Sequence, residues 1–245
     1  MSVDFYQDPQ RYDLFEGDFA TGDFLKFYVR QIEKYGEAVL ELCCGSGRLT
    51  IPLTEKGFNI KGLDLSDEML DLAKEKADRR NVKLNLVKGD MTDFDLNEKF
   101  NLIFIPAQSL SHLYTVAEVE KCFACVKKHL SENGRFLIEI FNPSFEILMR
   151  QPDKLYPQSN PGNVRVDSKI SYDKATQINH IELIFYNEAG NEETVLHFKM
   201  RQFFPQEIDA LLKYNGFRVE QKFGNYVEEK FNSNSPKQLI VCQKI

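Results

Sequence analysis

Apolar runs alternate with amphipathic stretches through the first 143 residues of the chain. Five short runs are apolar enough to be strands, at residues 38–42, 58–64, 82–87, 100–105 and 136–141. Between them, apolar residues recur at helical spacing, as in the stretch that Ser66 caps and that continues to Ala77. Strands that alternate with helices form a largely parallel sheet covered on both faces. The pattern therefore predicts a doubly wound, Rossmann-like α/β fold with a seven-stranded, mostly parallel sheet.

This alternation stops after residue 141. Four prolines lie within residues 142–163 and oppose a long helix or a central strand there. Three extended stretches follow without helices between them, at 164–172, 177–186 and 193–204, and predict an inserted antiparallel meander. A helix from Pro205 and a closing pair of strands, 217–223 and 239–242, are expected to complete the core sheet.

The first core strand ends in a loop with the sequence Glu-Leu-Cys-Cys-Gly-Ser-Gly-Arg, residues 41–48. Gly45 and Gly47 carry no Cβ, so a ligand can lie against bare backbone, and the helix that follows directs free N–H groups at it. Glu41 and Asp64 end the first two strands, where a carboxylate can accept the hydroxyls of a ribose. A third glycine in dinucleotide spacing is missing, which disfavours NAD.

These residues resemble the first motif of class I S-adenosylmethionine-dependent methyltransferases, with Cys43 in place of the first glycine. The resemblance implies that Cys43 takes up a glycine-like backbone shape and that Asp64 binds the ribose. Gly89-Asp90-Met91 resembles the motif whose aspartate meets the adenine amino group while the next residue packs on the ring. The segment 106–112 corresponds to the part of the family that lies beside the methionine end of the cofactor. The cofactor-binding residues expected on this basis are Tyr28, Glu41, Cys43, Gly45, Gly47, Arg48, Asp64, Leu65, Asp90, Met91 and Ala107.

Among subfamilies, the chain looks closest to small-molecule N-methyltransferases of the glycine and amino-sugar type. The resemblance implies a helical lid at residues 1–35, with aromatic residues that close over the cofactor and the acceptor. It also implies a cofactor-binding core at 36–143, an acceptor-pocket roof at 144–204, and a C-terminal part, 205–245, that completes the sheet. The meander could instead form a dimer interface, so the chain is expected to be a monomer or a homodimer.

Methyl transfer from a sulfonium is an in-line displacement, so the protein must chiefly place an acceptor lone pair on the axis of the methyl group. A base helps where the acceptor arrives protonated. Of the 4 histidines, His112 alone lies just past the carboxyl end of a core strand. We therefore expect His112 and Tyr12 to face the acceptor, although His112 could simply cap its loop. Arg48 could reach the cofactor carboxylate or pair on the helix surface.

Charge and composition narrow the possible partners. Lys and Arg total 31 against 37 Asp and Glu, a net charge of −6, so nucleic acid is not an expected partner. No apolar run reaches the roughly 18 residues of a membrane span and no export signal opens the chain, which predicts a cytoplasmic protein without membrane attachment. Cys122 and Cys125 fall in a helical pattern and are interpreted as packing, so no metal site is expected.

The predicted function is thus methyl transfer from S-adenosyl-L-methionine, with S-adenosyl-L-homocysteine as product, to a small molecule, at nitrogen. Two alternatives remain open: an enzyme that methylates protein or RNA, and a protein that binds the cofactor without turnover.

Overall fold

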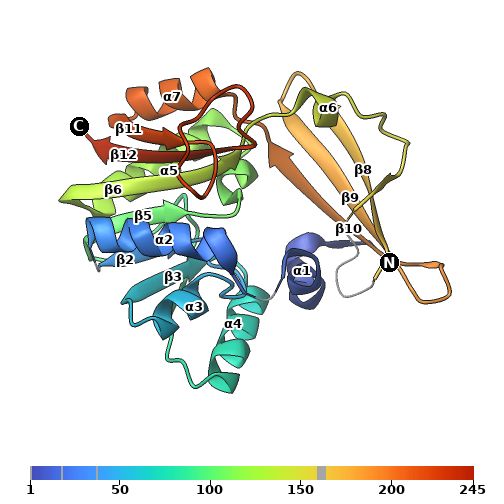
Figure 1. Ribbon diagram of the computed structural model, residues 1–245, viewed down its shortest axis with the longest axis horizontal. Helices are drawn as coiled ribbons and strands as arrows, with labels where there is room; N and C mark the ends of the chain where they lie inside the picture. The colour runs from blue at the N-terminus through green and yellow to red at the C-terminus, as the bar shows by residue number, and fades with distance from the viewer. Residues whose placement is uncertain (1, 18, 37, 159–163) are drawn as a thin grey trace.

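The computed structural model describes residues 2–17, 19–36, 38–158 and 164–245, and its larger sheet has seven strands (Figure 1). Their order is β11-β12-β6-β5-β2-β3-β4. The strands are β2 (Val39–Leu42), β3 (Ile60–Asp64), β4 (Asn85–Lys88), β5 (Phe100–Ile105), β6 (Leu130–Phe141), β11 (Phe217–Phe223) and β12 (Lys237–Lys244). Only β12 runs antiparallel to its neighbours in this sheet. The predicted Rossmann-like, mostly parallel sheet is confirmed.

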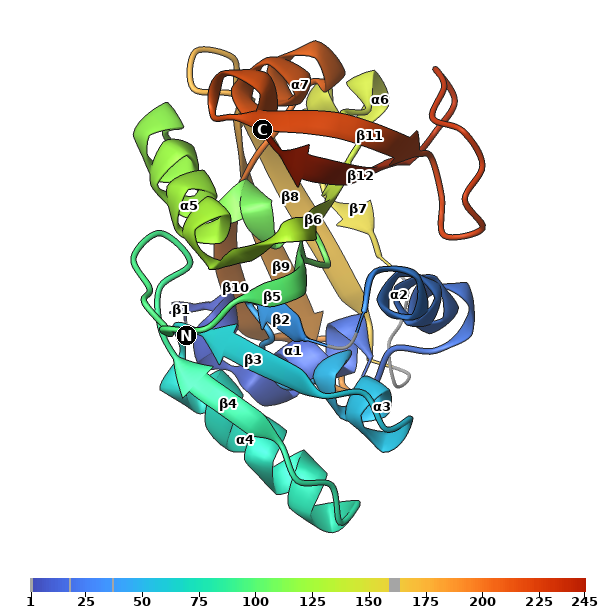
Figure 2. The same cartoon turned by 90° about the vertical axis from the view of Figure 1, so that its left-hand side faces the viewer.

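Helices cover both faces of this sheet, because its strands are apolar on both sides. Leu40 and Leu42 of β2 point into the cluster that α5 (Val116–His129) and α7 (Pro205–Tyr214) close, whereas Val39 points into the opposite one under α2 (Gly22–Tyr35) and α3 (Thr50–Glu55). Figure 2 shows α5 and α2 on opposite sides of the sheet. The helix α4 (Asp67–Arg79) packs on β3 and β4 and begins at Ser66, whose Oγ accepts the Met69 N–H at 3.1 Å.

The predicted meander forms a second sheet with the order β1-β10-β9-β8-β7. Its strands are β1 (Ser2–Asp4), β7 (Tyr156–Pro157), β8 (Val166–Asp173), β9 (Ile178–Tyr186) and β10 (Glu192–Arg201). In the described part of the proline-rich stretch before it, residues 142–158, the elements are the short α6 (Phe145–Leu148) and the edge strand β7. The sequence did not predict β1, which pairs in parallel with β10 and so brings the start of the chain to the insert.

The segment after β1 is ordered and lies between the core and the second sheet (Figure 1). It contains the 3-10 turn η1 (Phe5–Gln7) and α1 (Pro9–Glu16). Phe5 stacks on Phe198 of β10 with ring centroids 4.8 Å apart. On the core side, Asp13 bonds Ser46 and Lys76. Among the described residues, no helix is long and apolar enough to cross a membrane.

Candidate active site

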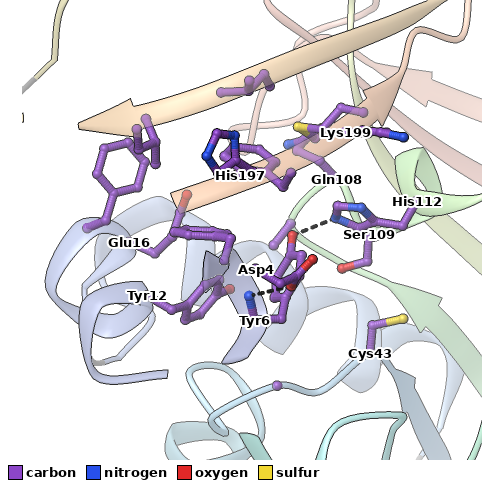
Figure 3. A pocket seen from close by; sticks show the side chains of 18 of the residues that line it. Asp4, Tyr6, Tyr12, Glu16, Cys43, Gln108, Ser109, His112, His197 and Lys199 are labelled. Atoms are coloured by element: carbon purple, nitrogen blue, oxygen red, sulfur yellow. Dashed lines mark hydrogen bonds between the residues drawn. The ribbon is translucent and has the colours of Figure 1, made fainter. Parts of the chain in front are cut away.

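A cavity of about 1340 Å³ opens at the carboxyl ends of the core strands, beneath the second sheet (Figure 3). This is larger than the roughly 300–1,000 Å³ of a pocket for one small ligand, so it has room for a cofactor and an acceptor together. Ten of the thirteen residues predicted for the site line it: Tyr12, Cys43, Gly45, Arg48, Asp64, Leu65, Asp90, Met91, Ala107 and His112.

The loop after β2 has the backbone shape that its glycines suggested. Cys43 takes a left-handed φ of 59°, in the region that glycine prefers, and Gly45 has φ 54°. A Cβ built at Gly45 would meet nothing within 4 Å, so the backbone there faces open cavity. Gly47 does not line the cavity. It lies against α3 instead, where a Cβ at this position would approach Ile51 Cδ1 to 2.9 Å. Its role is therefore close packing of α3 against the loop.

Two carboxylates follow the neighbouring strands β3 and β4 and face the cavity. Asp64 accepts the Gly45 N–H at 2.7 Å and the Ser66 N–H at 2.9 Å. Burial raises the pKa of Asp64, and the backbone hydrogen bonds partly oppose this effect. Asp90 accepts both the N–H and the hydroxyl of Thr92 on one oxygen, Oδ1. An ionised carboxylate has about four acceptor sites, so both side chains keep capacity for ligand hydroxyl or amino groups.

Besides Gly47, two predicted residues lie outside the cavity. Glu41 shares a strand face with Val39, which turns its side chain toward α3, and its carboxyl group accepts the Thr50 hydroxyl at 2.6 Å. Burial raises the pKa of Glu41 to about 8, so the group is protonated at neutral pH. Tyr28 is fully buried on the same face and donates its hydroxyl to Glu139 at 2.9 Å. The expectation that both contact the cofactor directly does not fit these positions.

Arg48 faces the cavity and also ties the glycine loop to α1. Its guanidinium donates to the backbone carbonyl of Glu16 and lies 3.4 Å from the Glu16 carboxylate. Its Nε atom is buried and has no hydrogen-bond partner among the described residues. Tyr12 lies beside it, with the guanidinium 6.0 Å from the ring centroid, and burial raises the pKa of Tyr12 to about 12. Arg48 thus pairs with α1 and lines the cavity, and its contact with the cofactor carboxylate stays a prediction.

His112 lies in the 3-10 turn η2 (Ser109–His112) after β5, and its partner is Tyr6 rather than Tyr12 (Figure 3). The Tyr6 hydroxyl and His112 Nε2 are 2.5 Å apart. Burial lowers the pKa of His112 to about 4 and raises that of Tyr6 well above its usual value. Both groups are therefore neutral at pH 7, with the hydroxyl as donor and Nε2 as acceptor. Tyr6 escaped prediction because the first 20 residues show no clear periodicity.

A second polar cluster in the cavity was also missed. Gln108, Glu139, Tyr226 and Lys237 line it together, although they come from the loop after β5, from β6, from the loop before β12, and from β12 itself. The one available signal was a glutamate in the otherwise apolar run 136–141, since a charged residue in a covered strand needs partners. The cysteine pair lies elsewhere: Cys122 is in the core and Cys125 Sγ lies 3.5 Å from the Thr92 carbonyl oxygen.

The chain is similar to known methyltransferases in sequence and in fold. Residues 39–134 match the methyltransferase-domain family. The chain is similar to the cypemycin N-terminal methyltransferase of a Streptomyces species, at 25% identity over 96% of this chain and 95% of that protein. It is also 27% identical to the glycine/sarcosine N-methyltransferase of Aphanothece halophytica, over 86% and 77% of the two chains. The structure of the CcbJ methyltransferase from Streptomyces caelestis superposes with a TM-score of 0.87, at 21% identity over 98% of each chain.

The chain carries a methyltransferase domain of the S-adenosylmethionine-dependent type. In this methyltransferase the matched residues span β2 to Gly134 within β6, so they include the glycine loop, Asp64 and Asp90. The N-terminal segment and the second sheet, which close the cavity from the other side, lie outside the matched residues.

Proposed function

We propose that the methyltransferase transfers a methyl group to an amine nitrogen of a small molecule by in-line displacement. The observation that carries this proposal is the single cavity of about 1340 Å³ that runs from the glycine loop to the second sheet. A cavity of this size has room for a cofactor and a small acceptor. Of two relatives that cover most of the chain, one is named a glycine/sarcosine N-methyltransferase and the other an N-terminal methyltransferase, which supports an amine as acceptor.

The chemistry of the loops fits the cofactor. The bare backbone at Gly45 leaves room for it, and Asp64 accepts the ribose hydroxyls. Asp90 and Met91 take the adenine, with the carboxylate on the amino group and the thioether side chain on the ring. The unpaired Nε of Arg48 suits the cofactor carboxylate. The bound cofactor supplies an electrophilic methyl group, and the residues named here orient it.

At the acceptor end we assign an orienting role to His112 rather than proton removal. A pKa of about 4 makes this imidazole a weak base at neutral pH, and its Nε2 already accepts the Tyr6 hydroxyl. That bond fixes the Tyr6 oxygen, whose lone pairs can then accept an N–H from the acceptor. The second sheet, as the roof of this half of the cavity, determines which acceptors fit.

Calorimetry tests the cofactor first. The protein should bind S-adenosylmethionine and S-adenosylhomocysteine but not NAD. Asp64→Ala should weaken this binding by about 1–3 kcal/mol, the range for hydrogen bonds lost from a buried site. Unchanged affinity in Asp64→Ala would place the ribose elsewhere.

A panel of amines then tests the reaction, with methylated product detected by mass spectrometry. The panel contains glycine, an amino sugar and a peptide with a free N terminus. Product with an amine and none with the matching alcohol is expected. Cofactor binding without product from any amine, or activity that depends on added RNA, would contradict the proposal.

A further inference from the structure

Glu139 is a buried carboxylate at the carboxyl end of the central strand β6, with 1% of its surface exposed. It accepts hydrogen bonds from five groups around it. They are the Tyr28 hydroxyl at 2.9 Å, the Ala107 N–H at 3.2 Å, Gln108 Nε2 at 3.0 Å, the Tyr226 hydroxyl, and Lys237 Nζ at 2.9 Å. The carboxylate thus joins the loop after β5 to α2, β12 and the loop before β12.

The hydrogen bond between Glu139 and Gln108 determines which way the Gln108 amide faces. Gln108 Nε2 donates to Glu139 Oε1 at 3.0 Å, so the NH₂ end of the amide lies against the carboxyl group. The amide oxygen, Oε1, must therefore face the other way. Gln108 is 5% exposed and lines the cavity (Figure 3), and its Oε1 has no hydrogen-bond partner among the described residues. A buried acceptor without a partner is destabilising, which points to a donor supplied by a ligand.

The position of Gln108 in the sheet indicates which chemical group of a ligand can reach it. The sheet order places β5 on one side of β2, with β3 and β4 on the other. Asp64 and Asp90, which we assign to the adenosine, follow β3 and β4. A cofactor laid across these strand ends carries its amino-acid part and its methyl group toward β5, and Gln108 follows β5. The donors that the proposed cofactor and acceptor bring to that end of the cavity are amine N–H groups.

We infer that Gln108 Oε1 accepts a hydrogen bond from an amine N–H at the transfer end of the cavity, and that Glu139 is the positioning residue that aims it. This inference rests on the proposed function. Two amines can supply the N–H: the α-ammonium of the cofactor, and an amine nitrogen at the position of methyl transfer.

Three ligands separate these two sources by calorimetry. S-adenosylhomocysteine carries the α-ammonium, and methylthioadenosine lacks it. Sinefungin carries the α-ammonium and a second amine in place of the transferred methyl group. The test variant is Gln108→Met, which keeps the length of the side chain and removes the amide. Gln108→Asn, which withdraws the oxygen by one methylene, carries the same test if the methionine variant does not fold.

Each source predicts its own pattern of losses. If the oxygen accepts the α-ammonium, S-adenosylhomocysteine and sinefungin both lose about tenfold or more in affinity while methylthioadenosine is unchanged. If it accepts an amine at the transfer position, only sinefungin loses affinity. An equal change for all three ligands, or no change for any, would overturn the inference.

Two further variants test the role of Glu139. Glu139→Gln removes the requirement that the NH₂ end of residue 108 face it, so this variant should reproduce the pattern of Gln108→Met. Tyr28→Phe removes another donor from the same carboxylate, outside the cavity, and should leave all three affinities unchanged. If Glu139→Gln binds the ligands like the wild type, Glu139 does not position the amide. None of these binding measurements needs an acceptor, so they can succeed or fail independently of the amine assay.

Discussion

The ion pair between Asp13 and Lys76 should be the strongest single contact between the N-terminal segment and the core. Lys76 Nζ lies 2.5 Å from Asp13 Oδ2, with only 5% and 6% of the two side chains exposed, and the Ser46 hydroxyl also donates to Asp13. Removal of one partner from a buried ion pair of this kind costs about 3–5 kcal/mol. We expect Lys76→Met to lose about this much free energy of unfolding. Because α1 carries Tyr12 and Glu16 into the cavity, S-adenosylhomocysteine should also bind more weakly.

Urea denaturation of four proteins measures the pair: the wild type, Asp13→Asn, Lys76→Met and the double variant. In the double variant both charges are gone, so its loss should be smaller than the sum of the single losses by more than about 1 kcal/mol. The same helix offers a matched control. Lys74 lies 2.9 Å from Asp71, but 59% and 73% of these side chains are exposed, so Lys74→Met should cost less than about 1 kcal/mol.

Two results would refute this reasoning. Lys76→Met could prove no more costly than Lys74→Met, which would mean that water reaches the pair and screens it. Alternatively, the single losses could simply add in the double variant, and the two charges would then not be coupled. In either case the N-terminal segment would be held by the apolar contact of Phe5 with the second sheet instead.

Three further predictions follow from individual side chains. The folded-state pKa of Glu41, about 8 against the ordinary 4.5, means that the folded protein holds a proton that the unfolded chain releases. The free energy of unfolding of the wild type should therefore fall by about 3–4 kcal/mol from pH 5 to pH 8, and Glu41→Gln should remove this dependence on pH. If urea denaturation gave the same dependence on pH for both proteins, the prediction would be wrong. Cys43→Gly should be about 1 kcal/mol more stable than Cys43→Ala, since alanine keeps the left-handed strain; equal melting temperatures would argue against strain at this position. Tyr6→Phe should lower kcat/KM for the amine acceptor about tenfold with little change in cofactor affinity, whereas unchanged kinetics would remove Tyr6 from the acceptor site.

The core sheet could be predicted because each of its elements is encoded locally. Period-two and period-3.6 patterns extend over six residues or more in most of them, and caps such as Ser66 mark where the helices begin. The third strand was placed at 82–87, and the observed β4 is shorter and later because polar residues surround it. The strand β1 has three residues, too few for any pattern, and its partner β10 lies about 190 residues further along the chain.

The candidate site likewise has residues that the sequence predicts and residues that it does not. Residues at strand ends and in the glycine loop were found because parallel strands bring their carboxyl ends to one edge. The direction of a side chain at such an end depends on the alternation along the strand. In β2 this alternation turns Glu41 under the loop. Tyr6 and Tyr226 reach the cavity from segments that only the tertiary fold brings together. Nothing local in the sequence distinguishes them from ordinary polar residues.

Two buried carboxylates hold the loops that border the central crevice. The sheet order reverses at β2, so the loops after β2 and β5 face each other there. Asp13 accepts a hydrogen bond from Ser46 in the first loop, and Glu139 accepts the Ala107 N–H in the second. Both loops contain non-glycine residues with left-handed φ, an unfavourable shape that persists only where the surroundings enforce it. In-line transfer tolerates little misplacement of the reacting atoms. The hydrogen bonds of Asp13 and Glu139 meet this demand, because they hold the loops on both sides of the crevice.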